Sequence, residues 1–427
     1  MATNKNTPKA APETNEEVSE KAIETTPTHA PSRKIYALAS SPVLWVVTIV
    51  ALLIGAFGLY QRLSEGMRTT ALGAYVPWGL WVATYEYLVW LEIGSLIVFT
   101  LLVYVFKTHP ILHKMALTLY LTALAILAMA LILIGLDLGH PFRFWHVLVS
   151  PQWNSLLAWM IWAHMIYMVV LLGKLLIEAY ATSESLKRTG LILSYVSVPL
   201  GIALVAIAGS VFGVVIGRPA WQGNGLPLYF LLSSMVVGTG LLTFLFVWFY
   251  PNKEDIDYLA TVRWMGKLLL GLLMAGLVAS ALGGMVLLYP GIPAQAEALR
   301  LALFGPFWWV YWILHIGLGV IVPILLLLLP RIPSPRQIGL AAGLLIVTFI
   351  AVPLNIVIPS QLVIGVIEAD LVNAFHGPTL NAGYFPTTSE WLVTLFAMAF
   401  GFLVFLFGFT VLRLRPRDES TSKEAVK

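Results

Sequence analysis

The amino-acid sequence predicts an all-α membrane protein with about ten transmembrane helices. Of its 427 residues, 59% are hydrophobic and 11% are charged, whereas roughly a quarter of the residues of a soluble domain are charged. Long stretches, such as residues 189–217 and 268–296, contain no Asp, Glu, Lys, Arg or His. Stretches of that length cross ~30 Å of hydrocarbon at ~1.5 Å per residue, so a membrane is the solvent that suits this chain.

The expected helices follow from apolar runs that are bounded by charged residues, Pro or Gly. In chain order they are residues 42–61, 77–106, 114–136, 152–180, 189–217, 226–250, 264–290, 303–330, 337–359 and 389–412. The first run begins only near Pro42 and lacks a small-residue cleavage site. We therefore expect it to be a membrane anchor and not a secretory signal peptide.

The distribution of Lys and Arg predicts the orientation in the membrane. An even number of spans puts both termini on one side. That side carries fifteen Lys and Arg residues, namely Arg33, Lys34, Lys107, Lys114, Lys174, Lys187, Arg188, Lys253, Arg263, Lys267, Arg331, Arg336, Arg413, Arg415 and Arg417. The opposite side carries five, namely Arg62, Arg68, Arg143, Arg218 and Arg300. Because cytoplasmic loops are enriched in Lys and Arg, we expect a bacterial inner-membrane protein with both termini in the cytoplasm. The opposite side then faces the periplasm.

The tails and the lack of cysteine limit what the chain can hold. Residues 1–35 are polar and rich in Thr, Pro, Ala and Glu, so we expect a disordered cytoplasmic tail there. Without cysteine, the chain cannot ligate an iron–sulfur cluster or attach a c-type haem. Such a redox centre would have to lie on a partner. The partners expected from composition are lipids, and nucleic acid is not among them.

The outer end of the third expected helix combines an acid, two imidazoles and a guanidinium. Pro141 ends the helix and fits the first position of a short interfacial helix. Asp137 and His140 then close the membrane helix, whereas Arg143 and His146 share a face of the next turn. These groups could form a pocket with mixed protonation states. Alternatively, Asp137 and Arg143 cap helix ends or pair with each other.

Two acids lie within the second expected helix. Glu86 lies ~14 Å below the outer end, and Glu92 lies ~9 Å deeper and is rotated by about 120° around the helix. A carboxylate at membrane depth is costly and by default marks a functional site. Glu92 could be a second step of a proton path or a paired structural acid.

Two histidines lie within membrane helices. His164, in the fourth helix, is expected near the depth of Glu86, and His315, in the eighth, at a similar depth. Each could be a structural histidine whose ring nitrogens form hydrogen bonds within the protein core. His315 is a weak candidate for a proton path. Together they could also be the axial ligands of a b-type haem. Haem bundles that carry electrons across the membrane usually need two such pairs, and only one pair has matched depth.

Two further segments are candidates for the outer surface. Gly217-Arg218-Pro219 follows the fifth helix and echoes the end of the third, so Arg218 could line the same pocket. The longest loop outside the tails, residues 360–389, suits the docking of a partner. Its polar residues include Gln361, Glu368, Asp370 and His376.

Three motifs together resemble the NrfD/PsrC family of membrane subunits. They are Pro77-Trp78-Gly79 at the start of a helix that contains an acid, the Asp-Leu-Gly-His-Pro-Phe-Arg-Phe-Trp run at 137–145, and Gly217-Arg218-Pro219. The resemblance covers about residues 70–360. The family usually has Arg where this chain has His140, which leaves a titratable group in place of a fixed charge. The ten-span layout and long tail look most like the membrane subunits of the menaquinone reductase complex of sulfate reducers and of alternative complex III.

The resemblance implies a fold of two four-helix bundles, helices 2–5 and 6–9, with a flanking helix at each end. It also implies a chain without haem or iron–sulfur cluster that exchanges electrons between a quinone and a docked, ferredoxin-like iron–sulfur subunit at the periplasmic face. Menaquinone is the expected quinone. A molybdopterin-family subunit and a multihaem cytochrome c are further expected partners. The chain would then be the quinone-reactive subunit of an oxidoreductase complex and not a catalyst on its own.

The expected units divide the chain into seven parts. They are a tail (1–35), an anchor with its loop (36–70), a first bundle with the quinone site (71–220), a second bundle (221–360), a periplasmic loop (361–388), a last helix (389–412) and a second tail (413–427).

A quinone takes up two electrons and two protons, so its site needs hydrogen-bond donors, titratable groups and an apolar slot for the tail. The expected proton-exchanging and hydrogen-bonding residues are Glu86, Asp137, His140 and His164. Arg143 would orient Asp137 and stabilise an anionic quinone. The expected walls and rim are Trp78, Tyr85, Trp159 and Arg218.

Two other classes of function remain as alternatives. Buried acids and histidines also occur in proton-coupled transporters, which use inverted repeats and broken helices at the midplane. The polar groups of this chain gather at one face, which disfavours a transporter. A membrane anchor for soluble redox subunits would have no need of Glu86 at membrane depth.

Overall fold

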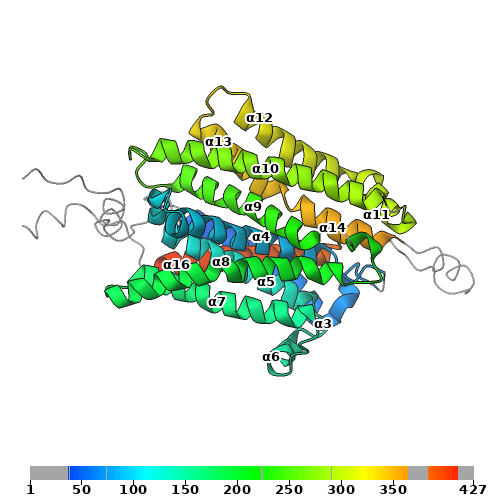
Figure 1. Ribbon diagram of the computed structural model, residues 1–427. Helices are drawn as coiled ribbons and strands as arrows, with labels where there is room; N and C mark the ends of the chain where they lie inside the picture. Colours follow the sequence, from blue (N-terminus) through cyan, green and yellow to red (C-terminus); the bar gives the residue numbers. More distant parts are fainter. Residues whose placement is uncertain are drawn as a thin grey trace, which may run out of the picture.

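The computed structural model describes residues 37, 39–73, 75–222, 225–289, 291–363 and 383–411. Within these ranges ten helices are long and apolar enough to cross a membrane, and no strand occurs. The predicted all-α membrane fold is therefore confirmed, with the long helices side by side (Figure 1). The expected tails, together with Glu368, Asp370 and His376 of the expected docking loop, lie outside the described residues.

The first bundle contains four helices, one of which is wholly buried. The four helices are α4 (Leu80–Thr100, extended by a π-helical turn at Leu101–Val105), α5 (Ala116–Asp137), α7 (Leu156–Tyr180) and α8 (Glu184–Gly213). Helix α4 packs against α5 and α8, and α7 packs against both α5 and α8. Every residue of α4 is buried. Polar side chains on α4 are therefore shielded from lipid on all sides.

The second bundle contains two helices that depart from the sequence expectation. Its members are α9 (Leu226–Phe249), α10 (Tyr258–Leu288), the π-helical η6 (Val310–Ile321) continued by α12 (Val322–Leu328), and α13 (Pro335–Thr348) followed by α14 (Ala351–Leu362). The start of the expected helix 303–330 belongs instead to a separate helix, α11 (Pro293–Phe304). The expected helix 337–359 is interrupted near Phe349. Pro353 has no N–H to donate to the carbonyl four residues earlier, which accounts for the break.

The two bundles meet where α4 crosses α9. A Cβ added to Gly94 would lie 1.8 Å from the carbonyl oxygen of Ser234, and one added to Gly238 would lie 2.2 Å from the carbonyl carbon of Gly94. Only hydrogen atoms separate the two backbones at this point. Small residues allow such close approach between membrane helices, where van der Waals packing drives association.

Both flanking helices cover the first bundle. Helix α3 (Pro42–Glu65) packs along α16 (Thr388–Val411), and α16 packs on α5. Gly55 faces Phe396 and Gly58 faces Leu392, so the pair is antiparallel. Helix α3 thus begins at the end of the bundle where α16 ends. We call this end the terminal face, and the other end the opposite face.

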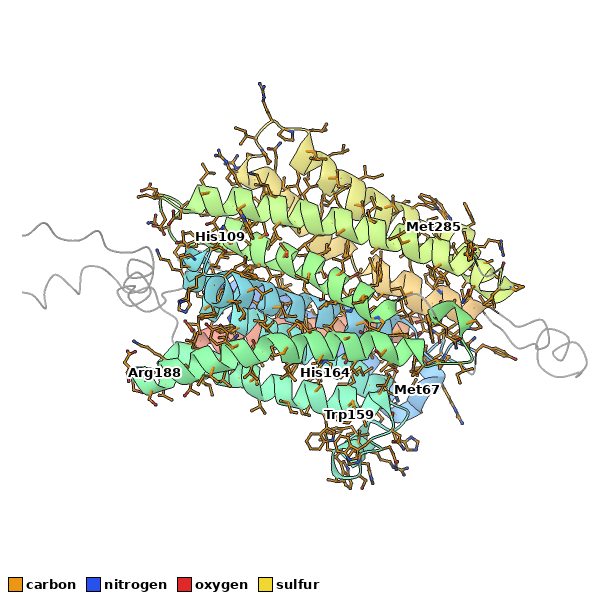
Figure 2. The ribbon with its side chains drawn as sticks, viewed as in Figure 1. Met67, His109, Trp159, His164, Arg188 and Met285 are labelled. Carbon is orange, nitrogen blue, oxygen red and sulfur yellow. The ribbon has the colours of Figure 1, made fainter. Side chains whose placement is uncertain are left out.

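Short helices connect the spans at both faces. At the opposite face they are η1 (Gly66–Thr69), η4 (Pro141–Arg143), α6 (His146–Val149) and η5 (Pro219–Trp221), and at the terminal face η3 (Pro110–Met115) precedes α5. Figure 2 shows His109 and Arg188 at the terminal face, and Met67 and Met285 at the opposite face. Figure 1 shows that α6 projects away from the bundle.

Several helices extend beyond the apolar runs that predicted them. Helix α8 begins at Glu184 and not at residue 189, and α10 begins at Tyr258 and not at residue 264. Charged residues near these ends remain helical. Lys174, which the sequence assigned to the terminal side, lies within α7 and is 3% exposed.

Replacing Gly94 by Ala should destabilise the fold, because the added Cβ has no space against the Ser234 carbonyl. Overpacking of this kind costs ~1–3 kcal/mol, so the thermal midpoint of the detergent-solubilised protein should fall. Gly271→Ala is the matched control, since that helical glycine has no atom within 4 Å of the added Cβ. Equal midpoints for the two variants would show that the crossing tolerates a wider separation.

Candidate functional site

The centre of the candidate site is formed by α4 and α7. Tyr85 of α4 and His164 of α7 are both buried, and the Tyr85 hydroxyl lies 3.4 Å from Nε2 and 3.5 Å from Nδ1 of the His164 ring. The Nδ1 atom is also 3.1 Å from the carbonyl oxygen of Met160. A carbonyl can only accept, so this contact assigns the proton to Nδ1 and leaves Nε2 for a hydroxyl or a ligand.

Two acids of α4, Glu86 and Glu92, interact electrostatically with Tyr85. Glu86 is 3% exposed and its Oε2 atom accepts no hydrogen bond within the described ranges. Glu92 is fully buried, and the same holds for both of its carboxylate oxygens. An ionised carboxylate without a partner is costly in a low dielectric. Each acid therefore needs a proton, a water or a ligand.

Asp137, at the end of α5, has a different neighbour from the one expected. Arg62 of α3 is 2% exposed, and it donates to the carbonyl oxygens of Leu136 at 2.9 Å and Leu138 at 2.7 Å. Its guanidinium also interacts electrostatically with the Asp137 carboxylate, whose Oδ1 atom is buried without a hydrogen-bond partner in the described part of the chain. Arg62 thus caps the end of α5 and supplies the positive charge beside Asp137.

Arg143 does not pair with Asp137. The ion pairs within 4.0 Å among the described residues join His113 to Glu178, Lys114 to Asp255, Lys187 to Glu184 and Arg300 to Glu297. The chain turns away from the bundle at Pro141, which leaves His140 and Arg143 exposed. The sequence placed both residues close to Asp137 along the chain but could not show this turn.

Trp159 lies between the projecting segment and the buried site. It is 48% exposed, and its Nε1 donates to the carbonyl oxygen of Trp153 at 2.7 Å. Figure 2 shows Trp159 on α7 next to the projecting segment, with His164 farther along the helix. Trp159, which we expected in the wall of the quinone site, therefore lies at the rim of the candidate site.

Trp78 lies in the segment that precedes α4, and Arg218 contacts that segment. Trp78 stacks on Trp221 with ring centroids 5.5 Å apart, and it meets the edge of Phe212 at 5.4 Å. Arg218 donates to the carbonyl oxygen of Tyr75, and to that of Gln361 at 3.4 Å. Both residues hold the start of α4 against α8 and α14.

Gln361, Tyr384 and Glu390 hold the same segment, and sequence reasoning missed this role. The Gln361 amide accepts from the Trp78 N–H at 3.1 Å and donates to the Trp78 carbonyl at 2.6 Å. Glu390 is fully buried and accepts from the Ala71 N–H at 3.0 Å and from the Tyr384 hydroxyl at 2.5 Å. In the sequence, this role is indicated only by Glu390, an acid at the start of an apolar helix. That position does not show which residues Glu390 contacts.

Tyr384 links this network to the first turn of α4. Its hydroxyl accepts from the Leu80 N–H at 2.8 Å while it donates to Glu390. Burial and the adjacent Glu390 carboxylate raise the pKa of the Tyr384 hydroxyl, so it keeps its proton at neutral pH. An N–H that has no intrahelical partner is thereby satisfied.

His315 is not brought into the cluster. It lies in η6 of the second bundle, 7% exposed, with the rings of Tyr311 and Phe349 at 5.7 and 5.8 Å. Among the described residues, these ring contacts have no residue in common with those of His164. Within the same ranges, no group of three or more His, Cys, Asp and Glu side chains could hold a metal ion.

Comparison with known proteins gives matches along most of the chain. The family profile described as "Polysulphide reductase, NrfD" matches residues 69–365. The chain is 30% identical to a subunit of the selenate reductase of Mesobacillus selenatarsenatis, over 86% of this chain and 92% of that protein. It is 25% identical to the "Hdr-like menaquinol oxidoreductase integral membrane subunit" of Archaeoglobus fulgidus, over 87% and 94%. It is 23% identical to the "Menaquinone reductase, integral membrane subunit" of Nitratidesulfovibrio vulgaris, over 87% and 91%.

Replacing Arg62 by Met should lower the free energy of unfolding by about 3 kcal/mol, because the carbonyl groups of Leu136 and Leu138 lose a buried, charged donor. Chemical denaturation of the detergent-solubilised protein measures this loss. Arg300→Met is the control, since Arg300 lies near the opposite face and pairs with Glu297 in an exposed position. If both variants lost the same small amount, the cap on α5 would not stabilise the fold.

Proposed function

The chain belongs to the NrfD family, and from this membership we infer that it is the membrane subunit of a respiratory oxidoreductase complex that binds a quinone. The observation that carries the inference is the cluster of Tyr85, Glu86 and His164 inside an apolar bundle. Asp137 lies beside Arg62 at the opposite face of the same bundle. Two relatives are named for menaquinone or menaquinol, which supports menaquinone as the quinone bound here.

The proposed chemistry needs donors for the quinone oxygens and groups that exchange protons. The Tyr85 hydroxyl is the donor for a quinone oxygen. His164 is suited to proton exchange, because Nδ1 donates to the Met160 carbonyl and Nε2 is then the unprotonated nitrogen, which can accept a proton from a quinol hydroxyl. Glu86 and Asp137 are suited to proton exchange, since each has a carboxylate oxygen without a hydrogen-bond partner among the described residues. The quinone supplies the two-electron chemistry when it is bound.

The other expected residues take supporting roles in this proposal. His140, Arg143 and Trp159 form an exposed rim, where they would contact the quinone as it enters or a docked subunit. Trp78 and Arg218 position the start of α4, and through it Tyr85 and Glu86. Arg62 takes the role first expected of Arg143, because it supplies the charge beside Asp137.

We further propose where the partners dock. The chain has no cysteine, so electrons leave or reach the quinone through an iron–sulfur subunit at the opposite face. The excess of Lys and Arg at the terminal face supports a cytoplasmic location of that face and a periplasmic location of the opposite face. A molybdopterin-family subunit or a multihaem cytochrome c would complete the complex.

Replacing Glu86 by Gln should slow quinone-dependent electron transfer by roughly 10²-fold or more, because a proton-exchanging group is removed. The complex would be purified from membranes and assayed with a soluble naphthoquinol and an artificial electron acceptor. Glu184→Gln, at an exposed position on α8, should leave the rate unchanged. Loss of the protein from the membrane in parallel with the rate would instead identify Glu86 as a structural acid.

The wild-type complex should carry menaquinone through purification, and His164→Leu should lose most of it. Mass spectrometry of lipid extracts, normalised to protein, measures the occupancy. A wild-type complex without quinone or an iron–sulfur subunit would contradict the proposed function. Retention of quinone in His164→Leu would place the head group elsewhere in the bundle.

A further inference from the structure

An apolar pocket lies at the opposite face, where the two bundles meet. Its walls come from the first turn of α4, from α14, and from the starts of η6 and α16 with the residues that precede them. Four of the lining side chains are at most 8% exposed, namely Leu80, Phe307, Val310 and Ile358. The cavity measures about 90 Å³, whereas one water needs ~10–15 Å³. It can therefore hold several non-hydrogen atoms of a ligand.

This pocket and the candidate quinone site lie on different faces of α4. Leu80 and Tyr87 are seven residues apart and therefore share a face of the helix. The Tyr87 hydroxyl donates to the carbonyl oxygen of Ile346 in α13, so that face points to the second bundle. Tyr85 is rotated by about 140° from Leu80 around the helix, and it contacts His164 in the first bundle. The body of α4 thus separates the pocket from the candidate site.

Asn355 of α14 brings an unpaired amide to this pocket. Its Nδ2 and Oδ1 atoms are both buried, and neither has a hydrogen-bond partner among the described residues. Leaving such a donor and such an acceptor unpaired is costly, and a leucine of similar volume would avoid that cost. Stability alone therefore does not account for an amide at this position.

A bound water is a poor partner for this amide. Buried waters usually form two to four hydrogen bonds to polar groups of the protein. The surface of the pocket is almost entirely apolar, and apart from Asn355 its described lining offers only the indole N–H groups of Trp309 and Trp391 as polar side-chain groups. An apolar molecule with a polar end would match both the walls and the amide.

The pocket opens toward the bilayer. Three of its aromatic side chains lie at the protein surface, with Trp309 40%, Trp391 51% and Phe385 65% exposed. Exposed tryptophans near the end of a transmembrane helix are typical of the membrane interface. The ring of Phe385 is parallel to that of the buried Phe307, with centroids 6.0 Å apart, so aromatic rings continue from the rim into the interior. No charged side chain lines the described part of the pocket, which favours a neutral ligand.

We propose that this pocket binds a neutral lipid whose polar end carries a carbonyl or hydroxyl oxygen. The Asn355 amide can donate to either kind of oxygen, and it can accept from a hydroxyl. Quinones, quinols and diacylglycerols share this chemistry. No described lining residue has an acidic or basic side chain, so the pocket holds its ligand without exchanging protons. The inference goes beyond the proposed function and does not depend on it.

The ligand of this pocket is held less firmly than a quinone at the candidate site. One amide offers fewer hydrogen bonds than the cluster of Tyr85, Glu86 and His164. The occupant is therefore expected to exchange with the bilayer and to be lost more readily during purification in detergent. A test must trap the ligand in place.

The test uses light to attach the occupant covalently. The purified complex in lipid nanodiscs is irradiated with one of two probes, a prenylated naphthoquinone or a diacylglycerol, each with a diazirine on its apolar chain. Peptide mass spectrometry then locates the label. We expect at least one probe to label the segments that line the pocket, which are residues 307–310, 354–358 and 385–391. The probe that labels them more strongly identifies the ligand as a quinone or a glycerolipid.

Variants distinguish a ligand in the pocket from lipid that only touches the surface. Asn355→Leu keeps most of the side-chain volume and removes the amide, so labelling should fall roughly tenfold. Its thermal midpoint without probe should not fall, because the lost amide has no partner among the described residues. Leu354→Phe narrows the pocket and should also reduce labelling. Asn154→Leu is the matched control, since Asn154 is exposed and does not line the pocket, and it should label like the wild type.

Three results would overturn the proposal. Equal labelling of the wild type and Asn355→Leu would show that the label reports lipid contact at the exposed tryptophans. Absence of label from all three segments with both probes would show that the pocket stays empty. A lower thermal midpoint for Asn355→Leu, with unchanged labelling in Leu354→Phe, would identify Asn355 as a structural residue.

His164→Leu separates the pocket from the proposed function. In this variant the pocket should be labelled as in the wild type, whereas naphthoquinone label on α7 should be lost. A wild-type complex that is labelled in the pocket but not on α7 would contradict the candidate quinone site and support the pocket. Label on α7 without label in the pocket would do the reverse.

Discussion

The contact between the backbones of α4 and α9 is the constraint on which the rest of the structure depends. It fixes the distance between the two bundles, and it leaves every residue of α4 surrounded by protein. A helix that faces lipid could not carry Glu86 and Glu92 without exposing them to hydrocarbon. Gly94 and Gly238 have no functional groups, but the close contact that they allow determines where acidic residues can be buried. The tight crossing and the candidate site are two results of one packing arrangement.

A second requirement is that the start of α4 be held in place at the opposite face. The first N–H groups of a helix have no intrahelical partner, and here the side chains of Tyr384, Gln361 and Glu390 bind the first turn and the segment before it. Arg62 does the same for the last carbonyl groups of α5. The proposed proton-exchanging groups are therefore carried on helices whose ends are fixed by hydrogen bonds, and not on loops.

The sequence predicted the spans well, because apolar runs bounded by charges depend on local composition. It also selected Glu86 and His164, which are conspicuous as polar residues inside such runs. It could not find Arg62 or Glu390, since their partners lie far away in the chain. Arg143 was expected beside Asp137 because the two residues are near in sequence, and Arg62 was not considered for this role. Which arginine lies beside Asp137 depends on the direction of the chain after Pro141. Amino-acid composition does not reveal that direction.

The hydrogen bonds at the start of α4 also bear on how the protein is made. Glu390 and Ala71 are 319 residues apart, and Gln361 and Trp78 are 283 apart. A ribosome that has inserted the first bundle has already delivered Tyr85, Glu86 and His164 to the membrane. The groups that hold α4 in register are still untranslated at that moment. The hydrogen bonds that hold the start of α4 can therefore form only when the last helix has entered the bilayer.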